Sequence, residues 1–359
     1  MSLLDTYAIN ENSHVPKYFQ LKEILGKILR TLRPGDIIPS EHQLAEHFKL
    51  HRLTARQAIS ELVSEGLLYR IHGSGTFVSE SDTQTTSNTI GCIFRGIRPR
   101  TASDNFFLEI FEAFEAELSV KNHFMLYKSL NNIDPKDIYS AILEIIATNP
   151  GGLVLDERVP DSVVEKLKSL NIPVILLNRQ SPVTSIKSVI PDNESAITLA
   201  LKYVRKQGHR KILFIYETAS QNQKEMADEL EKRSPYSNEL VIIPATETDF
   251  SGKSYRDAVK KGLKLHKPTA IITGFDWIAK NAYDVIEKHS LRIPDDISVI
   301  SIGGFDLAAN LNPPLTTVKI DTRQIGRTAA RAVLNTEEYP ETIKIPGYLE
   351  ERKSCTKLH

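Results

Sequence analysis

Two arginines four residues apart lie in a segment whose side chains suit contact with a polyanion. Arg52 and Arg56 stand near the start of an expected helix, so both guanidinium groups project from one helical face. An arginine can form two parallel hydrogen bonds with a guanine edge or with a phosphate. Thr54 and Gln57 add shorter hydrogen-bonding groups on the exposed side. This spacing favours a nucleic-acid-binding surface, although a solvated arginine face on a small structural domain has the same pattern.

A short turn rich in glycine follows that helix. His72, Gly73, Ser74 and Gly75 separate two runs typical of β-strands, LLYRI and TFV, which predicts a hairpin. The glycines leave backbone N–H groups free to approach a phosphate. The turn is not a dinucleotide-binding fingerprint, because the third glycine is missing and no helix follows.

The elements around these residues form a compact series. Residues 17–32 have apolar side chains near helical spacing, and Ser40 with Gln43 forms a capping-box pattern at the start of a second helix. A third helix is expected from about residue 54 to 65, with Gly66 just after its end. Three helices followed by a hairpin is the order of a winged helix-turn-helix, whose third helix enters the major groove of DNA.

The composition is that of an ordinary soluble protein with more than one domain. The chain has 359 residues, 41% of them hydrophobic and 25% charged. The net charge is zero, and residues 1–80 hold nine Lys and Arg against nine Asp and Glu. Any contact with DNA must therefore come from the placement of charge and not from its excess.

No segment predicts export or membrane insertion. No apolar run approaches the roughly 20 residues that span a bilayer, and the N-terminus lacks a basic region followed by an apolar one. Cys92 and Cys355 are far apart and fit neither a disulfide framework nor a metal-ligand spacing. We therefore expect a cytoplasmic protein that has no cofactor and no metal and does not contact a membrane.

The remainder of the chain has a different pattern of apolar residues from the first part. We assign residues 14–80 to the winged helix and 81–88, which include the polar run DTQTTSN, to a linker. In residues 89–359, apolar runs such as TIGCIF and KILFIY alternate with amphipathic helices, which predicts parallel sheets built from βαβ units. Two such series predict two α/β lobes, at about 89–187 and 188–315, and a returning segment at 316–359.

Tandem α/β lobes suggest a ligand held at the carboxyl ends of parallel strands. An enzyme is the competing interpretation. The sequence has no G-x-S-x-G elbow, no P-loop and no complete Rossmann glycine pattern, and we assign no catalytic residue.

The segment PGDIIPSEHQLAEHFKLHRLTARQAISELVSEGLLYRIHGSGTFV closely resembles the DNA-binding domain of the GntR family of bacterial transcription regulators. Its matching pieces include IPSEHQLA, R-x-T-x-R-x-A and HGSGTFV. The resemblance, together with the helix face and the turn, gives one set of candidate DNA contacts: Lys17, Tyr18, Ser40, Glu41, His42, His51, Arg52, Thr54, Arg56, Gln57, His72, Gly73, Ser74 and Gly75.

Two residues depart from the family pattern. His51 stands where the family usually has Ser or Thr, and Leu53 occupies a position that is often polar. The bases read near these two residues are therefore expected to differ from those of familiar family members.

Residues 89–335 resemble the effector domain of LacI-family repressors, which is similar to periplasmic sugar-binding proteins. The matching pieces include GGLVLDERV, PDNESAITLALKYVRKQGHRKILFI and LRIPDDISVISIGGFD. The resemblance implies a set of residues at or near an effector cleft: Phe106, Phe107, Arg179, Asp276 and Asp306. Aromatic faces would stack on a sugar ring, while the carboxylates and the arginine would bind its hydroxyl groups.

Each of these residues also has a structural alternative. The phenylalanines could belong to the core, Arg179 to a surface ion pair, and Asp306 to the cap of a turn; His209 is interpreted as structural. An arginine that usually follows the strand corresponding to KILFIY is absent, so Asn222 or Gln223 is expected in its place. That change disfavours an anionic effector.

The combined resemblances imply a homodimeric transcriptional repressor that binds a pseudo-palindromic operator under the control of a mono- or disaccharide. Three alternatives stay open: an activator, a regulator that senses a nucleobase or a sugar phosphate, and an α/β sugar enzyme with an added DNA-binding domain.

Overall fold

The fold was analysed in a computed structural model of the full chain. It describes residues 4, 7–10, 13, 15–29, 32–71, 73–79, 87–94, 102–131, 133–170, 172–233, 239–246 and 251–358, with the side chains of 102–105 excepted. The predicted linker, residues 81–88, lies outside this set except for its last two residues. Residues 1–88, together with residues 140–150, belong to one compact unit, and the remaining residues form a second one.

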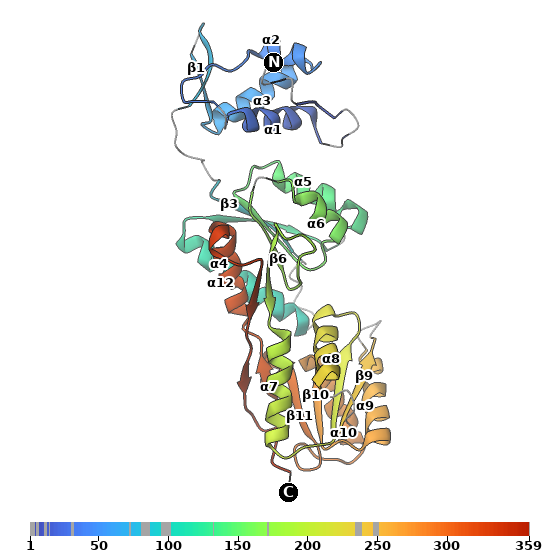
Figure 1. The fold of residues 1–359 in the computed structure, drawn as a ribbon. Helices are drawn as coiled ribbons and strands as arrows, with labels where there is room; N and C mark the ends of the chain where they lie inside the picture. The colour runs from blue at the N-terminus through green and yellow to red at the C-terminus, as the bar shows by residue number, and fades with distance from the viewer. Residues whose placement is uncertain are drawn as a thin grey trace. The chain divides into compact units, whose positions relative to one another are not determined.

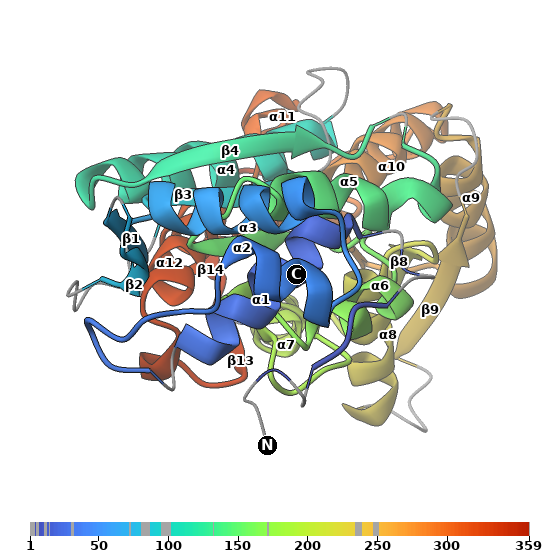
Figure 2. The same ribbon diagram turned by 90° about the horizontal axis from the view of Figure 1, so that it is seen from above.

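The N-terminal unit has the predicted order of three helices and a hairpin (Figures 1 and 2). Its elements are α1 (Lys17–Leu29), α2 (Glu41–His47), α3 (Arg52–Ser64), β1 (Leu68–Ile71) and β2 (Gly75–Val78). The apolar faces of the helices meet in one core, whose largest fully buried side chains are Leu21, Leu25, Leu44, Ile59, Leu62 and Leu68.

The N-terminal unit extends beyond the predicted boundary at residue 14. Leu4 is buried in the core of the helices, and Tyr7 and Ile9 pack against that core. Lys22 of α1 forms ion pairs with Glu61 of α3 and with Glu65, the C-cap residue of α3. The sequence did not predict this apolar arm, because it is too short to show a helical or strand period.

Lobe 1, the first α/β lobe, contains a sheet in which every pair of neighbouring strands is parallel. The strand order is β13–β7–β6–β5–β3–β4. The strands are β3 (Thr89–Phe94), β4 (Phe124–Ser129), β5 (Gly152–Leu155), β6 (Val174–Leu177), β7 (Lys187–Pro191) and β13 (Thr342–Ile345). The intervening helices are α4 (Ala102–Val120), a 3₁₀ turn (Pro135–Asp137), α5 (Ile138–Ile146) and α6 (Asp161–Leu167).

Lobe 2, the second lobe, contains a sheet with the order β14–β12–β11–β10–β8–β9, parallel except for β14. Its strands are β8 (Ile212–Glu217), β9 (Leu240–Ala245), β10 (Ala270–Thr273), β11 (Ser298–Gly303), β12 (Thr316–Lys319) and β14 (Tyr348–Glu350). Its helices are α7 (Asn193–Lys206), α8 (Gln221–Arg233), α9 (Lys253–His266), α10 (Asp276–Lys288) and α11 (Asp306–Asn310).

Helices cover both faces of the lobe 2 sheet. In β8, Ile212 and Phe214 pack in the same core cluster as α7 and α8, while Leu213 and Ile215 pack with α9 and α10. Alternation along the strand therefore supplies an apolar side chain to each layer, which explains why the run KILFIY is apolar without interruption.

The predicted lobe boundaries are corrected by strand pairing. Residues 187–191 form β7, which pairs with β6, so the chain leaves lobe 1 after Pro191. Residues 316–319 form β12, which pairs with β11, so they still belong to lobe 2. The chain then forms α12 (Thr322–Leu334), a 3₁₀ turn (Thr336–Glu338) and β13 in lobe 1, and it returns to lobe 2 as β14.

Helix α12 is the part of the returning segment that stabilises lobe 1. It lies along α4 (Figure 1), and Gly326 of α12 lies so close to the backbone of α4 that an added Cβ would be 2.2 Å from the Ile110 oxygen. Arg331 of α12 forms an ion pair with Glu117 of α4. The close approach of the two helices therefore depends on a glycine at this position.

Candidate DNA-binding surface and effector site

The residues predicted to read DNA stand on the open face of α3. Arg52 is 70% exposed at its side chain, and Arg56 and Gln57 are also exposed, whereas Thr54 is half-buried. The opposite face of α3 carries Ala55, Ala58, Ile59 and Leu62, all of which are buried. Because the apolar face fixes the rotation of the helix, the arginines face solvent together.

His51 is the N-cap of α3. Its Nδ1 accepts a hydrogen bond from the backbone N–H of Leu53 at 3.3 Å, which is the bond that a Ser or Thr oxygen usually makes at this position. In the neutral ring the proton is then on Nε2, so a donor remains at the outer edge of the imidazole. The departure from the family pattern thus keeps the cap and adds a ring at the end of the helix.

Glu41 connects the three parts of the domain. Its carboxylate lies 3.3 Å from Nη2 of Arg70 in the wing and 3.8 Å from Nε of Arg52 in α3. Arg70 Nη2 also donates to the Ser60 hydroxyl of α3 at 3.0 Å. Sequence reasoning missed Arg70, which alternation places on the same face of β1 as the buried Leu68. The geometry supports a role for Glu41 in orienting Arg52.

The wing has the predicted hairpin form. Strands β1 and β2 pair in antiparallel register, and the N–H of Ser74 closes the turn on the Ile71 oxygen at 3.0 Å. Gly73 and Gly75 have φ angles of 79° and 131°, which explains their use at the tip. Both glycines and Ser74 are exposed, and His72 lies outside the described residues.

The other candidate DNA contacts are at the edges of the same unit. Lys17 at the first position of α1 and His42 of α2 are exposed, and Tyr18 is half-buried. The exposed Ser40 caps α2: its hydroxyl accepts from the Gln43 N–H, and the Gln43 side chain accepts from the Ser40 N–H, which confirms the predicted capping box.

The predicted effector residues fall into two groups at the carboxyl ends of the strands. In the first group, Phe106 of α4 is only 8% exposed, and its ring centroid is 5.1 Å from that of Phe107 and 6.0 Å from that of Phe305 in lobe 2. Phe275 extends this aromatic cluster within lobe 2. The structure therefore places Phe106 in an apolar contact between the lobes, which corresponds to the structural alternative, while Phe107 is half-buried.

Asp276 is not positioned as the sequence predicted. Its carboxylate is fully buried and accepts hydrogen bonds from the Ser301 hydroxyl and from the N–H groups of Gly304 and Phe305. Burial raises the pKa of Asp276, and these hydrogen bonds act in the opposite direction. One oxygen binds Ser301 within β11 and the other holds the loop after β11, so the structure shows a positioning role in place of an open effector contact.

Asp306 follows that loop as the first residue of α11. Its side chain is exposed, and the N-cap position of α11 belongs to Phe305, so Asp306 stands one residue inside the helix and not at its cap. The preceding Phe305 contacts Phe106. Asp306 therefore lies next to the contact between the lobes and is a carboxylate that a ligand can reach.

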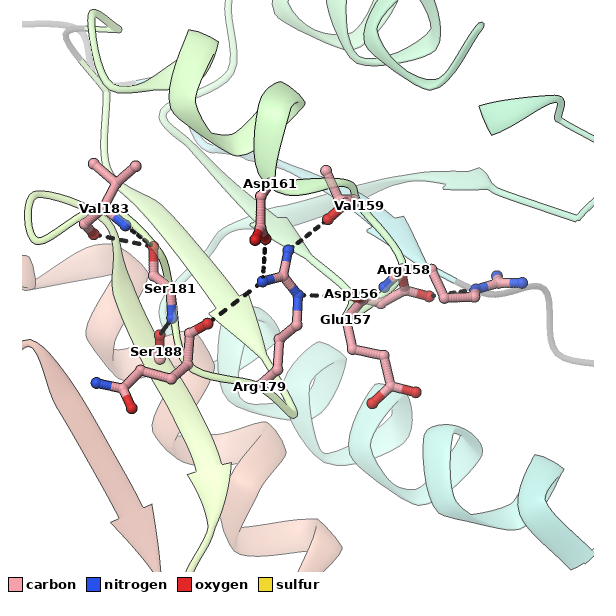
Figure 3. A network of polar contacts seen from close by, with 10 residues as sticks. Asp156, Glu157, Arg158, Val159, Asp161, Arg179, Ser181, Val183 and Ser188 are labelled. Atoms are coloured by element: carbon pink, nitrogen blue, oxygen red, sulfur yellow. Dashed lines mark hydrogen bonds and ion pairs between the residues drawn. The ribbon is translucent and has the colours of Figure 1, made fainter. Parts of the chain in front are cut away.

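In the second group, Arg179 is held within lobe 1 (Figure 3). Its guanidinium donates to the Glu157 oxygen at 2.9 Å, the Val159 oxygen at 2.6 Å and the Asp161 carboxylate at 2.7 Å. A weaker bond reaches the Gln180 oxygen at 3.4 Å. These contacts use four of the five N–H donors, so Arg179 clamps the loop after β5, while its predicted contact with the effector stays a prediction.

Asn222 and Gln223 are at the start of α8. Gln223 accepts from the N–H of Glu217 at 2.8 Å and thereby fixes the end of β8. Asn222 reaches lobe 1, where its Nδ2 lies 3.1 Å from the Asn178 backbone oxygen and 3.0 Å from its side-chain oxygen. Sequence reasoning missed Asn178, although it precedes Arg179 at the carboxyl end of a predicted strand.

His209 has the structural role that the sequence predicted. It is buried in lobe 2, with Nε2 3.0 Å from the Thr356 oxygen and Nδ1 3.1 Å from the Thr269 hydroxyl. Burial lowers the pKa of His209.

Within the described residues, no group of three or more His, Cys, Asp or Glu side chains is arranged to hold a metal ion. None of the helices in the described ranges combines the length and apolar character needed to cross a membrane.

Comparison with known proteins agrees with both predicted resemblances. Residues 21–78 match the model of the bacterial regulatory proteins of the gntR family, and residues 201–355 match that of a periplasmic binding protein-like domain. The arabinose metabolism transcriptional repressor of Geobacillus stearothermophilus is 30% identical over 351 residues, which are 92% of this chain and 94% of that protein.

Solved structures agree on the fold of the second part. A LacI-family regulator, CCPA from Weissella paramesenteroides with bound sucrose, has a TM-score of 0.64 and 21% identity, and the match covers 76% of this chain and 100% of that one. The lac repressor dimer bound to operator and the anti-inducer ONPF has a TM-score of 0.65 and 21% identity, over 76% and 96% of the two chains. The predicted two-lobed α/β fold is thus confirmed.

Proposed function

The chain belongs to a family of bacterial transcriptional repressors in which a gntR-type DNA-binding domain precedes a periplasmic-binding-protein-like domain, and we propose that a small sugar controls its binding to operator DNA. The observation that carries this proposal is the exposed, capped face of α3 with Arg52 and Arg56. The same chain contains a second module whose fold is that of ligand-binding proteins.

The support for a sugar comes from chemistry and from relatives. Asp306 offers an exposed carboxylate directly after Phe305, and the half-buried Phe107 lies next to Phe106 in the same aromatic cluster. A carboxylate together with an aromatic face suits a hydroxyl-bearing ring. Solved structures of similar fold hold sucrose, ribose or glucose. The curated relative with 30% identity is a repressor of arabinose metabolism. We therefore propose a mono- or disaccharide as effector, in a cytoplasmic protein that acts as a homodimer.

The mechanism follows from linkage between two sites. A sugar that binds one arrangement of the lobes more tightly than the other shifts the population toward that arrangement. If that arrangement misplaces the paired DNA-binding domains, operator affinity falls, and by reciprocity operator DNA weakens sugar binding by the same factor. None of these steps changes the sugar chemically.

The decisive experiment combines DNA binding with ligand screening. A duplex recovered by selection from a randomised pool serves as operator, and a thermal-shift panel of mono- and disaccharides identifies a stabilising ligand. We expect that ligand to release the duplex and to be recovered unchanged. Chemical conversion of the sugar would instead favour the enzyme alternative. Tighter binding of the duplex in the presence of the sugar would favour a regulator that binds DNA only together with its effector.

The DNA-binding surface is tested with a matched pair of variants. Arg52→Ala should weaken binding to the selected duplex by about tenfold or more, since a bidentate arginine contact contributes about 1–3 kcal/mol of discrimination. Sugar binding should not change. Lys121→Ala, an exposed cation in the α/β part of the chain, is the control and should leave both unchanged. Equal operator affinity of Arg52→Ala and the wild type would contradict the assignment of α3.

A further inference from the structure

Three asparagines form a hydrogen-bonded bridge between the lobes, which we call the asparagine bridge: Asn178, Asn193 and Asn222. Asn178 follows β6 in lobe 1, and Asn222 is the second residue of α8 in lobe 2. Asn193 is the first residue of α7, directly after the chain passes from lobe 1 to lobe 2. The bridge therefore joins both lobes at one of the points where the chain crosses between them.

The orientation of each amide follows from its partners. Asn193 Nδ2 lies 2.9 Å from Glu225 Oε2 and 2.9 Å from Asn222 Oδ1. A carboxylate oxygen only accepts, so the group that faces Glu225 must be the amide nitrogen. Asn222 then presents its oxygen to Asn193 and its nitrogen to Asn178, where the backbone oxygen and Oδ1 accept its two hydrogens.

This arrangement uses the donors of Asn222 completely. Both of its N–H hydrogens are directed at Asn178, and its oxygen already accepts from Asn193. A ligand that accepts from the Asn222 amide nitrogen would compete with Asn178, whereas the Asn222 oxygen keeps a second lone pair. The bonds give Asn222 a role between the lobes, and the predicted effector contact of Asn222 or Gln223 stays a prediction.

The lobe 1 end of the bridge is held rigidly. Asn178 is 7% exposed and has a φ angle of 64°, and its N–H donates to the Val189 oxygen at 3.0 Å. Its amide nitrogen donates to the Glu157 carboxylate. The next residue, Arg179, clamps the same loop through its bonds to Glu157 and Val159 (Figure 3). Movement of Asn178 therefore requires movement of the loop that follows β5.

The lobe 2 end is also fixed. Gln223, the neighbour of Asn222, binds the N–H of Glu217 at the end of β8. Its side-chain oxygen would lie 2.4 Å from a Cβ added to Gly274, so it packs directly against the end of β10. Because each end of the bridge is attached to strand ends of its own lobe, a change in the lobe arrangement must break the bonds between Asn178 and Asn222.

We propose that the asparagine bridge is a latch that favours one arrangement of the two lobes, and that Asn222 and Asn178 are positioning residues for the effector response. The effect on operator binding rests on the proposed function, whereas the effect on lobe arrangement does not. The latch consists entirely of protein groups, so its strength is set by the amides and is present with or without a sugar.

The first test measures the arrangement of the lobes directly. Spin labels are attached to Val120→Cys in lobe 1 and Leu265→Cys in lobe 2, whose native side chains are 78% and 71% exposed. The native thiol Cys92 is fully buried, and a sample without introduced cysteines controls for labelling of Cys92 and Cys355. In this background, Asn222→Asp replaces both N–H donors by acceptors of nearly the same shape, and it places a charge against the Asn178 oxygens.

We expect Asn222→Asp to shift or broaden the distribution of distances between the labels, with neither DNA nor sugar present. Asn149→Asp makes the same change from amide to carboxylate at an exposed asparagine after α5 and should leave the distribution unchanged. Asn178→Gly accepts the positive φ and removes the side-chain part of the bridge, so it should shift the distribution in the same direction as Asn222→Asp. Identical distributions for the wild type and both bridge variants would overturn the proposal.

The second test separates a latch from a ligand contact. A latch variant changes the balance of two arrangements, so operator affinity without sugar and sugar affinity should change in opposite directions, each by about three- to tenfold. A lost effector contact would instead lower sugar affinity and leave operator affinity unchanged, and that result would also overturn the proposal. Should no sugar bind the wild type, the proposed function fails, while the label distances still decide whether the latch exists.

Discussion

At the scale of single residues, the DNA-binding face combines family features with two substitutions of its own. His51 replaces the usual hydroxyl but still caps α3 through Nδ1. Leu53, one helical position beyond Arg52, keeps 63% of its surface exposed even though it is apolar. An exposed leucine between two candidate base contacts is positioned for an apolar partner, and the exposed apolar group of a base pair in the major groove is the thymine methyl.

We therefore predict that Leu53 reads a thymine methyl group. Leu53→Ala should weaken binding to the selected duplex by about fivefold, as expected when an apolar contact of one or two methylene groups is lost. The check is a cycle in which each thymidine of the duplex is replaced in turn by deoxyuridine, which lacks only the methyl. At one position, replacing thymidine by deoxyuridine should lower the affinity of the wild type and leave the affinity of Leu53→Ala unchanged. Equal sensitivity of both proteins at every position would show that Leu53 has no such contact.

Asp306 is the residue that we expect to bind the effector in lobe 2. Asp306→Asn keeps the shape of the side chain and removes its charge, so sugar affinity should fall by about tenfold while operator affinity stays unchanged. Titration with the sugar identified by thermal shift measures the loss. Asp257→Asn removes an exposed carboxylate of α9 and serves as the control. If Asp306→Asn binds the sugar with the affinity of the wild type, the effector site does not include this residue of α11.

At the scale of elements, the sequence predicted best where a periodic pattern coincided with a buried face. The helices of the winged unit and the strands β3, β8, β10 and β11 carry uninterrupted or regularly spaced apolar residues, and the structure confirms them. Strands β7 and β12 were missed as strands of their own because Lys187–Pro191 and Thr316–Lys319 mix polar and apolar residues. Both strands contain buried serine or threonine side chains, and they form because their backbones pair with neighbouring strands. A local sequence pattern does not reveal such pairing.

For the candidate effector residues, too, the sequence predicted the element on which each residue lies but not its contacts with distant segments. The sequence placed Arg179, Asn222 and Asp276 correctly at strand ends, because the carboxyl ends of parallel strands are recognisable from the alternation of elements. It did not reveal the hydrogen-bond partner of each side chain. The clamp of Arg179 depends on the loop after β5, and Asn222 depends on an asparagine 44 residues earlier in the chain.

The C-terminal tail is an element that contacts a buried titratable group, His209. It lies against lobe 2, where Val299 donates to the Ser354 oxygen and His209 contacts the Thr356 oxygen. Since burial lowers the pKa of His209, the unfolded chain binds a proton more readily than the folded one below the ordinary value of 6.5. The contribution of His209 to the free energy of unfolding is therefore present above pH 6.5. It is lost as the pH falls through 6.5 toward the lower pKa of His209 in the folded state.

We expect the melting temperature of the protein to decrease between pH 7 and pH 5 because of this residue. His209→Gln, which does not titrate but keeps hydrogen-bonding groups, should have a lower melting temperature at pH 7 and a smaller decrease on acidification. Calorimetric melting curves of both proteins at half-unit steps of pH provide the measurement. Parallel curves for the two proteins would assign the acid sensitivity to other groups.

At the scale of the whole molecule, a protein with zero net charge must gain operator affinity from the arrangement of a few contacts. One winged helix presents only a short recognition helix of 13 residues and one wing. Two copies held together add their contacts, since the second domain then binds at a high effective concentration. The proposed homodimer therefore explains how a domain without excess positive charge can select one site among many.

This argument predicts a dependence of affinity on the spacing between half-sites. Two domains related by a twofold axis need half-sites on the same side of the duplex, separated by a whole number of turns of about 10–10.5 base pairs. Insertion of about five base pairs at the centre of the selected duplex rotates one half-site to the opposite side. We expect this duplex to bind about as weakly as a single half-site, and sedimentation should show one dimer on the original duplex. If the insertion leaves affinity unchanged, each chain reads DNA independently, and a sugar could then act only within one chain.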